Sequence, residues 1–169
     1  MRVVYCKIKE EFHQNLLSRY LALFNEEYQN KILRFHRWQD AQLSILGRLL
    51  LKKEMTYLGY TIDFEQLQYT EFNKPYFENT NIEFNISHSG NIVIIVIADK
   101  NEKIGIDIEK NQSIRVEDFE NQMTNKEVQI ITNSPNETVA FYNYWTEKEA
   151  VIKANGSGLQ IPLKSFEVV

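Results

Sequence analysis

The amino-acid sequence predicts an α+β fold, in which strands are grouped together and do not alternate strictly with helices. Three observations lead to this class. Short β-branched runs cluster between residues 82 and 109, two long stretches have helical periodicity, and turn residues separate these segments. The chain of 169 residues is long enough to build a hydrophobic core, in one domain or in two small lobes.

The first half of the chain combines short strands with a long helical stretch. Val3–Ile8 is predicted to be the first strand. Glu26–Tyr57 contains no proline and has apolar residues at helical intervals, so we expect helix there, ending at Gly59. Leu67–Thr70 is a short strand candidate, and Asn73-Lys74-Pro75 predicts a turn.

The second half begins with strands and ends mainly in helices. Strands are predicted at Ile82–Ile86, Ile92–Ala98 and Ile104–Glu109, with a tight connection at Asp99–Lys103. Further along, the pattern predicts a helix over Val116–Ile131, a break at Pro135, a longer helix over Glu137–Ala154 that stops at Gly156 and Gly158, and the start of another strand over Leu163–Val169.

Composition excludes several classes of protein. Hydrophobic residues make up 43% of the chain and charged residues 25%, which is typical of a globular protein and not of a disordered one. The longest apolar run, Ile92–Ala98, is too short to span a bilayer, and Met1–Glu10 lacks the apolar region of a signal peptide. Cys6 is the single cysteine, so no intrachain disulfide can form. These observations favour a cytoplasmic protein without a membrane partner.

Charge is distributed unevenly along the chain. The net charge of −4 argues mildly against a nucleic-acid partner. The segment from Lys31 to Lys53 nevertheless carries six basic residues and a single acid, Asp40. This segment indicates an anionic ligand or partner at one place, although a solvated helix face would show the same pattern.

The predicted strand Ile104–Glu109 carries two acids with a spacing that suits a metal ion. Side chains alternate along a strand, so Asp107 and Glu109 would share one face about 7 Å apart. At that separation two carboxylates repel by about 2 kcal/mol at an effective dielectric of about 20, and a magnesium ion would reverse the sign. Gly105 would let a ligand approach. The alternative is an ordinary half-exposed strand.

The segment around Trp145 places Glu149 and Lys153 on one helical face. Two structural alternatives remain open. Thr146 and Glu149 have the spacing of a capping box, and Glu149 with Lys153 could be a surface ion pair. Tryptophan is more often a core residue than a site residue.

A turn is expected at Ser87-His88-Ser89-Gly90, between two strands. Ser87 and His88 are adjacent, so their side chains point apart in an extended segment, which argues against a nucleophile with its base. The hydroxyl groups and the imidazole suit anion contacts better, with His88 as a donor to a phosphate. A turn histidine without a ligand is the alternative.

These stretches, taken in order, resemble the surfactin-type 4'-phosphopantetheinyl transferases. The resemblance runs from about residue 27 to the end of the chain. It is carried by three main motifs and several shorter matches: Phe84–Gly90, Ile104–Lys110 and Trp145–Lys153; then Asn73-Lys74-Pro75, Arg34-Phe35, Asp40-Ala41, Leu46-Gly47-Arg48, Gly158-Leu159, Pro162-Leu163 and Ser165-Phe166. The combination is specific, although each piece alone is weak.

The resemblance implies a fold and an activity. The fold would have two similar α+β lobes in a pseudo-twofold arrangement, at residues 1–100 and 101–169, with the site in the cleft between them. Relatives continue for several strands beyond the stretch that matches Leu163–Val169, so the C-terminal lobe is expected to be short at its end. The enzyme, expected to be a monomer, would transfer 4'-phosphopantetheine from coenzyme A to a serine of an apo acyl or peptidyl carrier protein, releasing 3',5'-ADP. The alternative is a coenzyme A- or carrier-binding protein of the same fold without turnover.

The resemblance also implies residue roles. Magnesium, with manganese as an alternative, would be held by Asp107, Glu109 and Glu149. Lys153 would stabilise the charge on the leaving group. The general base is left open between Glu149, which we favour, Glu109, and a metal-bound water. Contacts to coenzyme A would come from Lys31, Ser44, Arg48, Lys74, Ser87, His88, Lys148 and Lys153.

Three positions depart from the family pattern. Asn73 replaces a glycine before Lys74, although asparagine also tolerates a left-handed turn. Tyr28 and Leu43 stand where basic residues are common in relatives. These two changes leave more of the 3'-phosphate contact to Lys31, Arg48 and His88.

Overall fold

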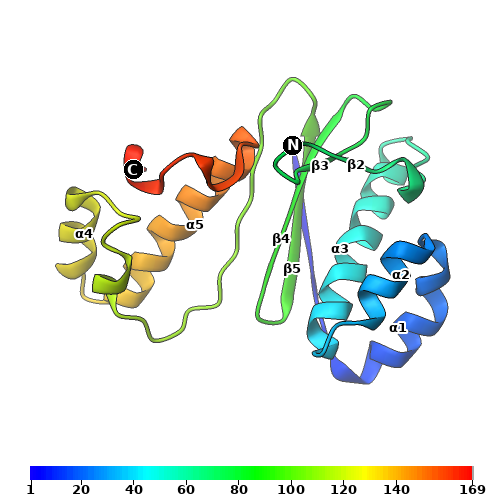
Figure 1. Ribbon diagram of the computed structural model, residues 1–169, viewed down its shortest axis with the longest axis horizontal. Coiled ribbons are helices and arrows are strands. Elements are labelled where there is room, and N and C mark those ends of the chain that lie inside the picture. The colour runs from blue at the N-terminus through cyan, green and yellow to red at the C-terminus, as the bar shows by residue number, and fades with distance from the viewer. Residues whose placement is uncertain (169) are drawn as a thin grey trace.

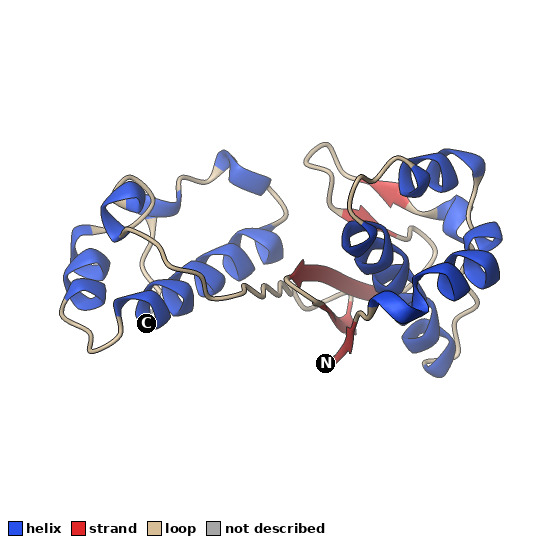
Figure 2. Cartoon of the chain, turned by 90° about the horizontal axis from the view of Figure 1, so that it is seen from below, coloured by secondary structure: helices blue, strands red, loops and turns tan. Residues whose placement is uncertain are grey.

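The computed structural model describes residues 1–168, apart from the side chain of Leu159. The α+β class is confirmed, and all strands lie before residue 100. Figure 1 shows the strands in the middle of the molecule, helices α1–α3 on one side and helices α4 and α5 on the other. Figure 2 shows the same two groups of helices joined through the strands and an extended segment. Over residues 100–168, the structure contains helices and extended chain but no strand.

The main sheet has three antiparallel strands, β1 (Arg2–Lys7), β4 (Ile82–Ser89) and β5 (Ile92–Asp99). Their order is β1-β5-β4, so the β4–β5 hairpin is completed by the N-terminal strand. Because side chains alternate along β4, Phe84 faces the main core while Asn85 and Ser87 face the other side. One face of β4 therefore contributes to the core, and the other binds the segment that contains Ile106 and Asp107.

Helices α1 (His13–Tyr20), α2 (Glu26–Leu33) and α3 (Trp38–Tyr57) pack on one face of this sheet. The core between them is built mainly of buried aliphatic and aromatic side chains, including Ile32, Ile45, Leu51, Met55, Phe84, Ile95 and Ile97. The predicted helical stretch Glu26–Tyr57 divides into α2 and α3 at residues 34–37. Helix α1 was not predicted.

A small second sheet pairs β2 (Gln68–Tyr69) with β3 (Pro75–Tyr76). The predicted turn between these strands is confirmed, because Asn73 has a φ of 61°, the left-handed region that asparagine tolerates. Six short 3-10 helices connect the larger elements, at Glu10–Phe12, Leu21–Leu23, Phe64–Gln66, Val116–Phe119, Gly158–Gln160 and Leu163–Ser165.

The second group of helices consists of α4 (Asn125–Thr132) and α5 (Glu137–Asn155). The predicted helix Val116–Ile131 is therefore a 3-10 turn followed by α4, and Pro135 lies in the break as expected. Trp145 packs against Phe119 and Phe141 in a separate small core. Helix α5 ends at Gly156, whose φ of 81° matches the predicted stop.

Two predicted strands were wrong. Ile104–Glu109 is extended and runs beside β4, but side chains join the two segments. The Ile106 N–H donates to Asn85 Oδ1 at 3.0 Å and the Lys110 N–H donates to Ser89 Oγ at 3.0 Å. Because these side chains stand between the two backbones, no ladder of backbone hydrogen bonds forms.

The last predicted strand, Leu163–Val169, begins as a 3-10 turn over Leu163–Ser165 and continues as irregular chain to Val168. Val169 lies outside the described residues. The carbonyl groups of Leu163 and Phe166 accept hydrogen bonds from a buried lysine, Lys148, so this segment is anchored by a side chain. Among residues 1–168, no helix is both long enough and apolar enough to cross a membrane.

Candidate active site

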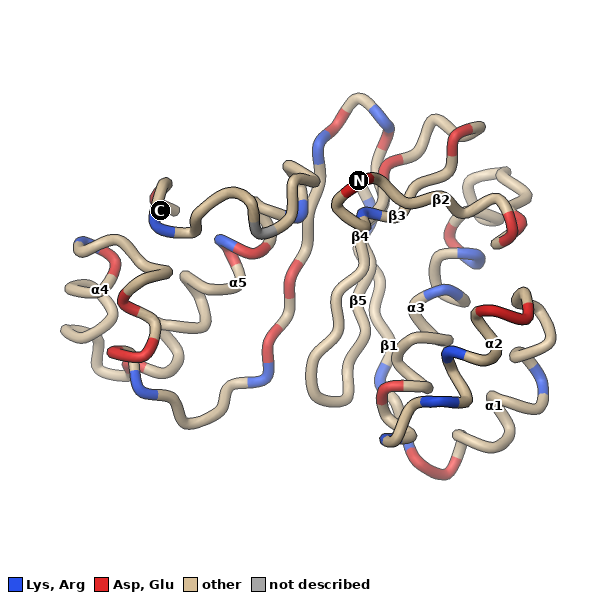
Figure 3. The backbone as a smooth tube through the Cα atoms, viewed as in Figure 1, with Lys and Arg blue, Asp and Glu red and all other residues tan. Residues whose placement is uncertain are grey.

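The extended segment 104–110 lies between β4 and α5 (Figure 3), and its two acids accept hydrogen bonds from serines of β4. Gly105 makes this arrangement possible. A Cβ atom there would stand 2.0 Å from the carbonyl oxygen of Ala150 and 2.5 Å from the amide nitrogen of Ala154, both in α5. Gly105 therefore allows a close approach of helix α5, and the prediction that it admits a ligand was wrong.

The Asp107 side chain is almost fully enclosed, with 3% of its surface exposed. Its Oδ1 atom accepts a hydrogen bond from Ser87 Oγ at 2.8 Å and lies 2.5 Å from Lys153 Nζ. Lys153 also donates to Ser87 Oγ at 3.1 Å. The fold thus joins β4, the extended segment and α5 at one point. The second carboxylate oxygen, Oδ2, is buried and has no hydrogen-bond partner.

Glu109 is held in a parallel way. Ser89 Oγ donates to Glu109 Oε2 at 2.8 Å and accepts the N–H of Lys110. Ser89 was not among the predicted site residues. The sequence does contain a signal for it, because Ser87 and Ser89 have the same i, i+2 spacing as Asp107 and Glu109. Two serines of β4 therefore face two acids of the neighbouring segment.

Glu149 projects from α5, one helical turn before Lys153. Burial raises the pKa of the Glu149 carboxyl; the positive charge of Lys153 opposes this effect, and the negative charges of Asp107 and Glu109 add to it. The capping-box alternative is excluded, because Thr146 lies in the middle of α5 and its hydroxyl donates to the Tyr142 carbonyl at 2.8 Å. The three predicted metal acids thus lie close enough to influence one another.

The side chains are not arranged as a finished metal site. Within residues 1–168, no three His, Cys, Asp or Glu side chains are grouped so that they could hold a metal ion as they stand. Lys153 binds Oδ1 of Asp107, and Ser89 binds Oε2 of Glu109. The unpartnered Oδ2 of Asp107 and a set of hard carboxylate oxygens nevertheless fit magnesium.

A cavity of about 280 Å³ is lined by one of these acids, Glu149. Lys153, Asn73, Lys74 and Asn85 are among its other lining residues. Lys74 forms an ion pair with Glu83 of β4, and its aliphatic chain passes over Gly156, where an added Cβ would lie 3.2 Å from the Lys74 Cδ. The lining of the cavity therefore includes two lysines and one acid.

A larger cavity of about 700 Å³ lies next to the first, and Asn73 lines both. Lys31, Arg48 and Tyr28 are among its lining residues. The Arg48 guanidinium stacks 3.4 Å from the centroid of the Tyr28 ring and donates to the Tyr69 hydroxyl at 2.8 Å. These contacts hold a positive charge at a fixed place in the cavity.

Ser44 supports this cavity indirectly. Its hydroxyl lies 2.7 Å from the Tyr28 hydroxyl, so it fixes the ring on which Arg48 stacks. Burial raises the pKa of the Tyr28 hydroxyl, and the charge of Arg48 partly opposes that effect. Tyr28, which stands where relatives often have a basic residue, thus positions Arg48.

Ser87 and His88 lie within strand β4, so the turn predicted there was wrong; the turn comes at Gly90 and Asn91. Their side chains point to opposite faces, which excludes the nucleophile-and-base alternative. His88 is exposed and pairs with Val93, which packs on Leu43 of α3. The structure therefore places His88 on the side of α3, and it places Ser87 with Asp107.

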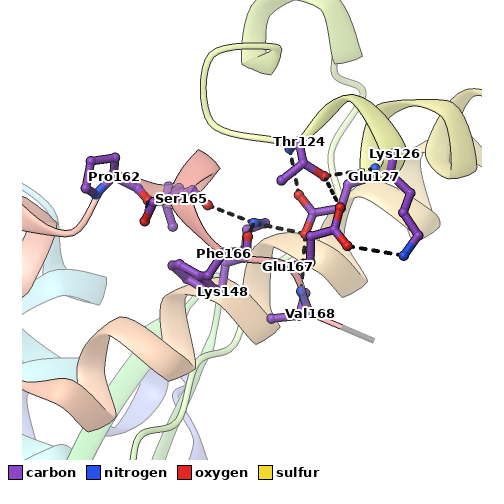
Figure 4. Close-up of polar contacts among 10 residues, drawn as sticks. Thr124, Lys126, Glu127, Lys148, Pro162, Ser165, Phe166, Glu167 and Val168 are labelled. Carbon is purple, nitrogen blue, oxygen red and sulfur yellow. Dashed lines mark hydrogen bonds and ion pairs between the residues drawn. The ribbon is translucent and has the colours of Figure 1, made fainter.

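Lys148 does not reach either cavity. Its side chain is 0% exposed, its Nζ lies 2.9 Å from Glu127 Oε1, and it donates to the carbonyls of Leu163 at 2.8 Å and Phe166 at 2.6 Å (Figure 4). The ammonium is thereby held by two hydrogen bonds and one ion pair. The prediction that Lys148 contacts coenzyme A is corrected accordingly.

The chain is similar in sequence to known proteins. Two family models match the chain: "4'-phosphopantetheinyl transferase, N-terminal" over residues 11–100, and "4'-phosphopantetheinyl transferase superfamily" over residues 103–169. The 4'-phosphopantetheinyl transferase Sfp of Bacillus subtilis (strain 168) is 33% identical over 156 residues, covering 89% of this chain and 68% of that protein. The 4'-phosphopantetheinyl transferase gsp of Aneurinibacillus migulanus is 31% identical over 170 residues, covering 98% and 70%.

The L-aminoadipate-semialdehyde dehydrogenase-phosphopantetheinyl transferase of Xenopus laevis is 31% identical over 158 residues, covering 83% of this chain and 52% of that protein.

Proposed function

Because the chain belongs to the 4'-phosphopantetheinyl transferase superfamily and is an enzyme that transfers phosphopantetheine from coenzyme A to carrier proteins, we propose that the acids between β4 and α5 form its catalytic centre. The observation that supports this most directly is Asp107, a buried carboxylate with one oxygen on Lys153 and the other without a partner. A buried charge of this kind is costly unless it has a function or a counter-ion.

Asp107, Glu109 and Glu149 would hold a magnesium ion in this proposal, with manganese as an alternative. The ion would neutralise part of the charge on the pyrophosphate. Lys153, which faces the smaller cavity, would stabilise the negative charge that develops on 3',5'-ADP as it leaves.

The proton of the carrier serine goes to Glu149 in this proposal. The serine oxygen forms a bond to the β-phosphorus of coenzyme A, the bond between that phosphorus and the bridging oxygen breaks, and the electron pair leaves with 3',5'-ADP. Glu149 lines the smaller cavity next to Lys153, so its carboxylate is placed to accept this proton. Glu109 is the second candidate.

The two adjoining cavities would bind coenzyme A. Lys31 and Arg48, with Ser44 behind Tyr28, line or support the larger cavity and would contact the nucleotide phosphates. Lys74 would contact the nucleotide from the smaller cavity. His88 lies on the same side of the sheet as α3 and would complete the 3'-phosphate contact. Ser87 donates a hydrogen bond to Asp107 in this arrangement.

We further propose a division into lobes at residues 1–100 and 101–169. The separate hydrophobic cores around Phe84 and around Phe141 support this boundary, as do the family models, which meet between residues 100 and 103.

The substrate would be an apo acyl or peptidyl carrier protein. Carrier proteins are usually acidic, so the basic α2–α3 surface is a reasonable contact for one. We propose that the enzyme works as a monomer in the cytoplasm.

A transfer assay tests the proposal. Apo carrier proteins of fatty-acid, polyketide and nonribosomal-peptide type are incubated with coenzyme A and magnesium, and intact mass reports the added phosphopantetheine. Asp107→Asn is expected to reduce the rate at least about 100-fold, as loss of a transition-state charge contact does. Full activity of that variant would contradict the metal assignment, and coenzyme A binding without transfer by the wild-type chain would contradict the catalytic one.

A further inference from the structure

We propose that Lys153 takes the place of the metal ion on Asp107 when the site holds no metal, so that its ammonium and a divalent cation compete for the same carboxylate. This inference rests on the proposed function of the site. It gives Lys153 a second role, which precedes the chemical step.

The first reason is that Asp107 needs a positive partner. The carboxylate is 3% exposed, and a buried carboxylate without a counter-charge is strongly destabilising. Lys153 Nζ lies 2.5 Å from Oδ1, and the other contact of that oxygen is the neutral hydroxyl of Ser87. Lys153 is therefore the group that compensates the charge.

The second reason is that the side chains of Asp107 and Lys153 differ in how freely they can move. Asp107 is fixed by the extended segment and by Ser87, whereas the Lys153 side chain is 28% exposed and faces the 280 Å³ cavity. A lysine ammonium on a flexible four-carbon stem can turn from the carboxylate into that cavity without a change in the backbone. Lys153 is thus the partner that would move.

The third reason is the present arrangement of the acids. Within residues 1–168 they are not grouped to hold a metal ion, and Glu109 is bound to Ser89. A cation that approaches Asp107 meets the positive charge of Lys153 on the adjacent oxygen. Because a pyrophosphate in the cavity would attract Lys153 away, coenzyme A and the metal should bind with positive coupling.

Mn²⁺ binding in the absence of coenzyme A tests this inference, because it does not depend on turnover. Free Mn²⁺ is measured by electron paramagnetic resonance for the wild-type chain and for Lys153→Met, Lys153→Gln and Lys153→Arg. We expect the Met and Gln variants to bind Mn²⁺ at least about fivefold more tightly, the lower end of typical coupling between two sites. The Arg variant keeps the charge and should stay near wild type.

Lys74→Met is the matched control. Lys74 lines the same cavity but is paired with Glu83, so its removal changes the net charge equally without freeing Asp107. Its Mn²⁺ affinity should stay within about twofold of wild type, since Lys74 is paired with Glu83 and not with Asp107. Melting temperatures verify that each variant is folded, and Lys153→Gln, which keeps a hydrogen-bond donor, covers the case in which Lys153→Met does not fold.

Unchanged or weaker Mn²⁺ binding by both neutral variants would overturn the inference, as would an equal gain in Lys74→Met. Asp107→Asn separates this outcome from a failure of the proposed function. If Asp107→Asn weakens Mn²⁺ binding but the Lys153 variants do not strengthen it, the metal site stands and the competition is refuted. If Asp107→Asn has no effect, the metal assignment itself is wrong.

Discussion

Replacing Lys148 with methionine distinguishes between two possible roles of this residue. The family resemblance implies a contact with coenzyme A, whereas the structure places the ammonium group in a buried cluster with Glu127 and the chain segment 163–168 (Figure 4). Methionine keeps most of the volume of the side chain and removes the charge together with two hydrogen bonds and one ion pair. The variant should therefore have a lower stability, and not simply a lower affinity for coenzyme A.

The expected loss of stability follows from Glu127, whose carboxylate stays buried when Lys148 is replaced. The Glu127 side chain is 2% exposed, so without Lys148 its carboxylate is a buried charge with only the N–H groups of Thr124 and Val168 as partners. Removing one partner of a buried pair typically costs about 3–5 kcal/mol. For a chain of this length each kcal/mol lowers the melting temperature by about 2–4 °C, so we expect a decrease of about 6–20 °C.

Thermal unfolding followed by circular dichroism measures the effect. Lys126→Met is the matched control, because Lys126 pairs with Glu167 in the same region at 3.1 Å, but both side chains are largely exposed. Exposed ion pairs contribute little, so this variant should melt close to wild type. Adding Glu127→Gln to Lys148→Met removes the buried charge and should recover part of the loss.

One result would refute the reasoning. If Lys148→Met melts like Lys126→Met while its affinity for coenzyme A falls strongly, then Lys148 is a ligand contact and the buried cluster does not represent the working enzyme. Calorimetric titration with coenzyme A on the same samples provides this second measurement.

Three further variants test other parts of the structure. Gly105→Ala forces a Cβ against the backbone of α5, so we expect a loss of about 3 kcal/mol or more in urea unfolding; a near-neutral result would show that segment 104–110 does not lie against α5. Gly156→Ala places alanine at a φ of 81° and should cost about 1 kcal/mol by the same assay, whereas no loss would mean that α5 ends differently. Arg48→Lys loses the stacking on Tyr28 and should weaken binding of 3',5'-ADP about 5- to 30-fold, equivalent to about 1–2 kcal/mol; unchanged calorimetric affinity would remove Arg48 from the nucleotide site.

The sequence alone determined the features that depend on neighbouring residues. The alternating or continuous apolar patterns located β1, β4 and β5, the helical periodicity located α5, and Asn73 and Gly156 marked a turn and a helix end that both adopt positive φ. Each of these follows from local backbone preference and from one face of an element being buried. The spacing of Asp107 and Glu109 singled out those two acids as candidates, and Glu149 joined them through the family resemblance.

Tertiary structure decided the rest, because burial and pairing depend on chain segments that are distant in sequence. Lys148 and Lys153 stand on the same helix, and nothing in their local sequence tells them apart. Residues 163–168 enclose the first, while Asp107 of the extended segment binds the second. Likewise, the alternation in Ile104–Glu109 predicted a strand, yet the side chains of Asn85 and Ser89 across from it replaced the backbone ladder. A local pattern specifies which faces are polar, and only the packing of remote segments determines which partner each polar group meets.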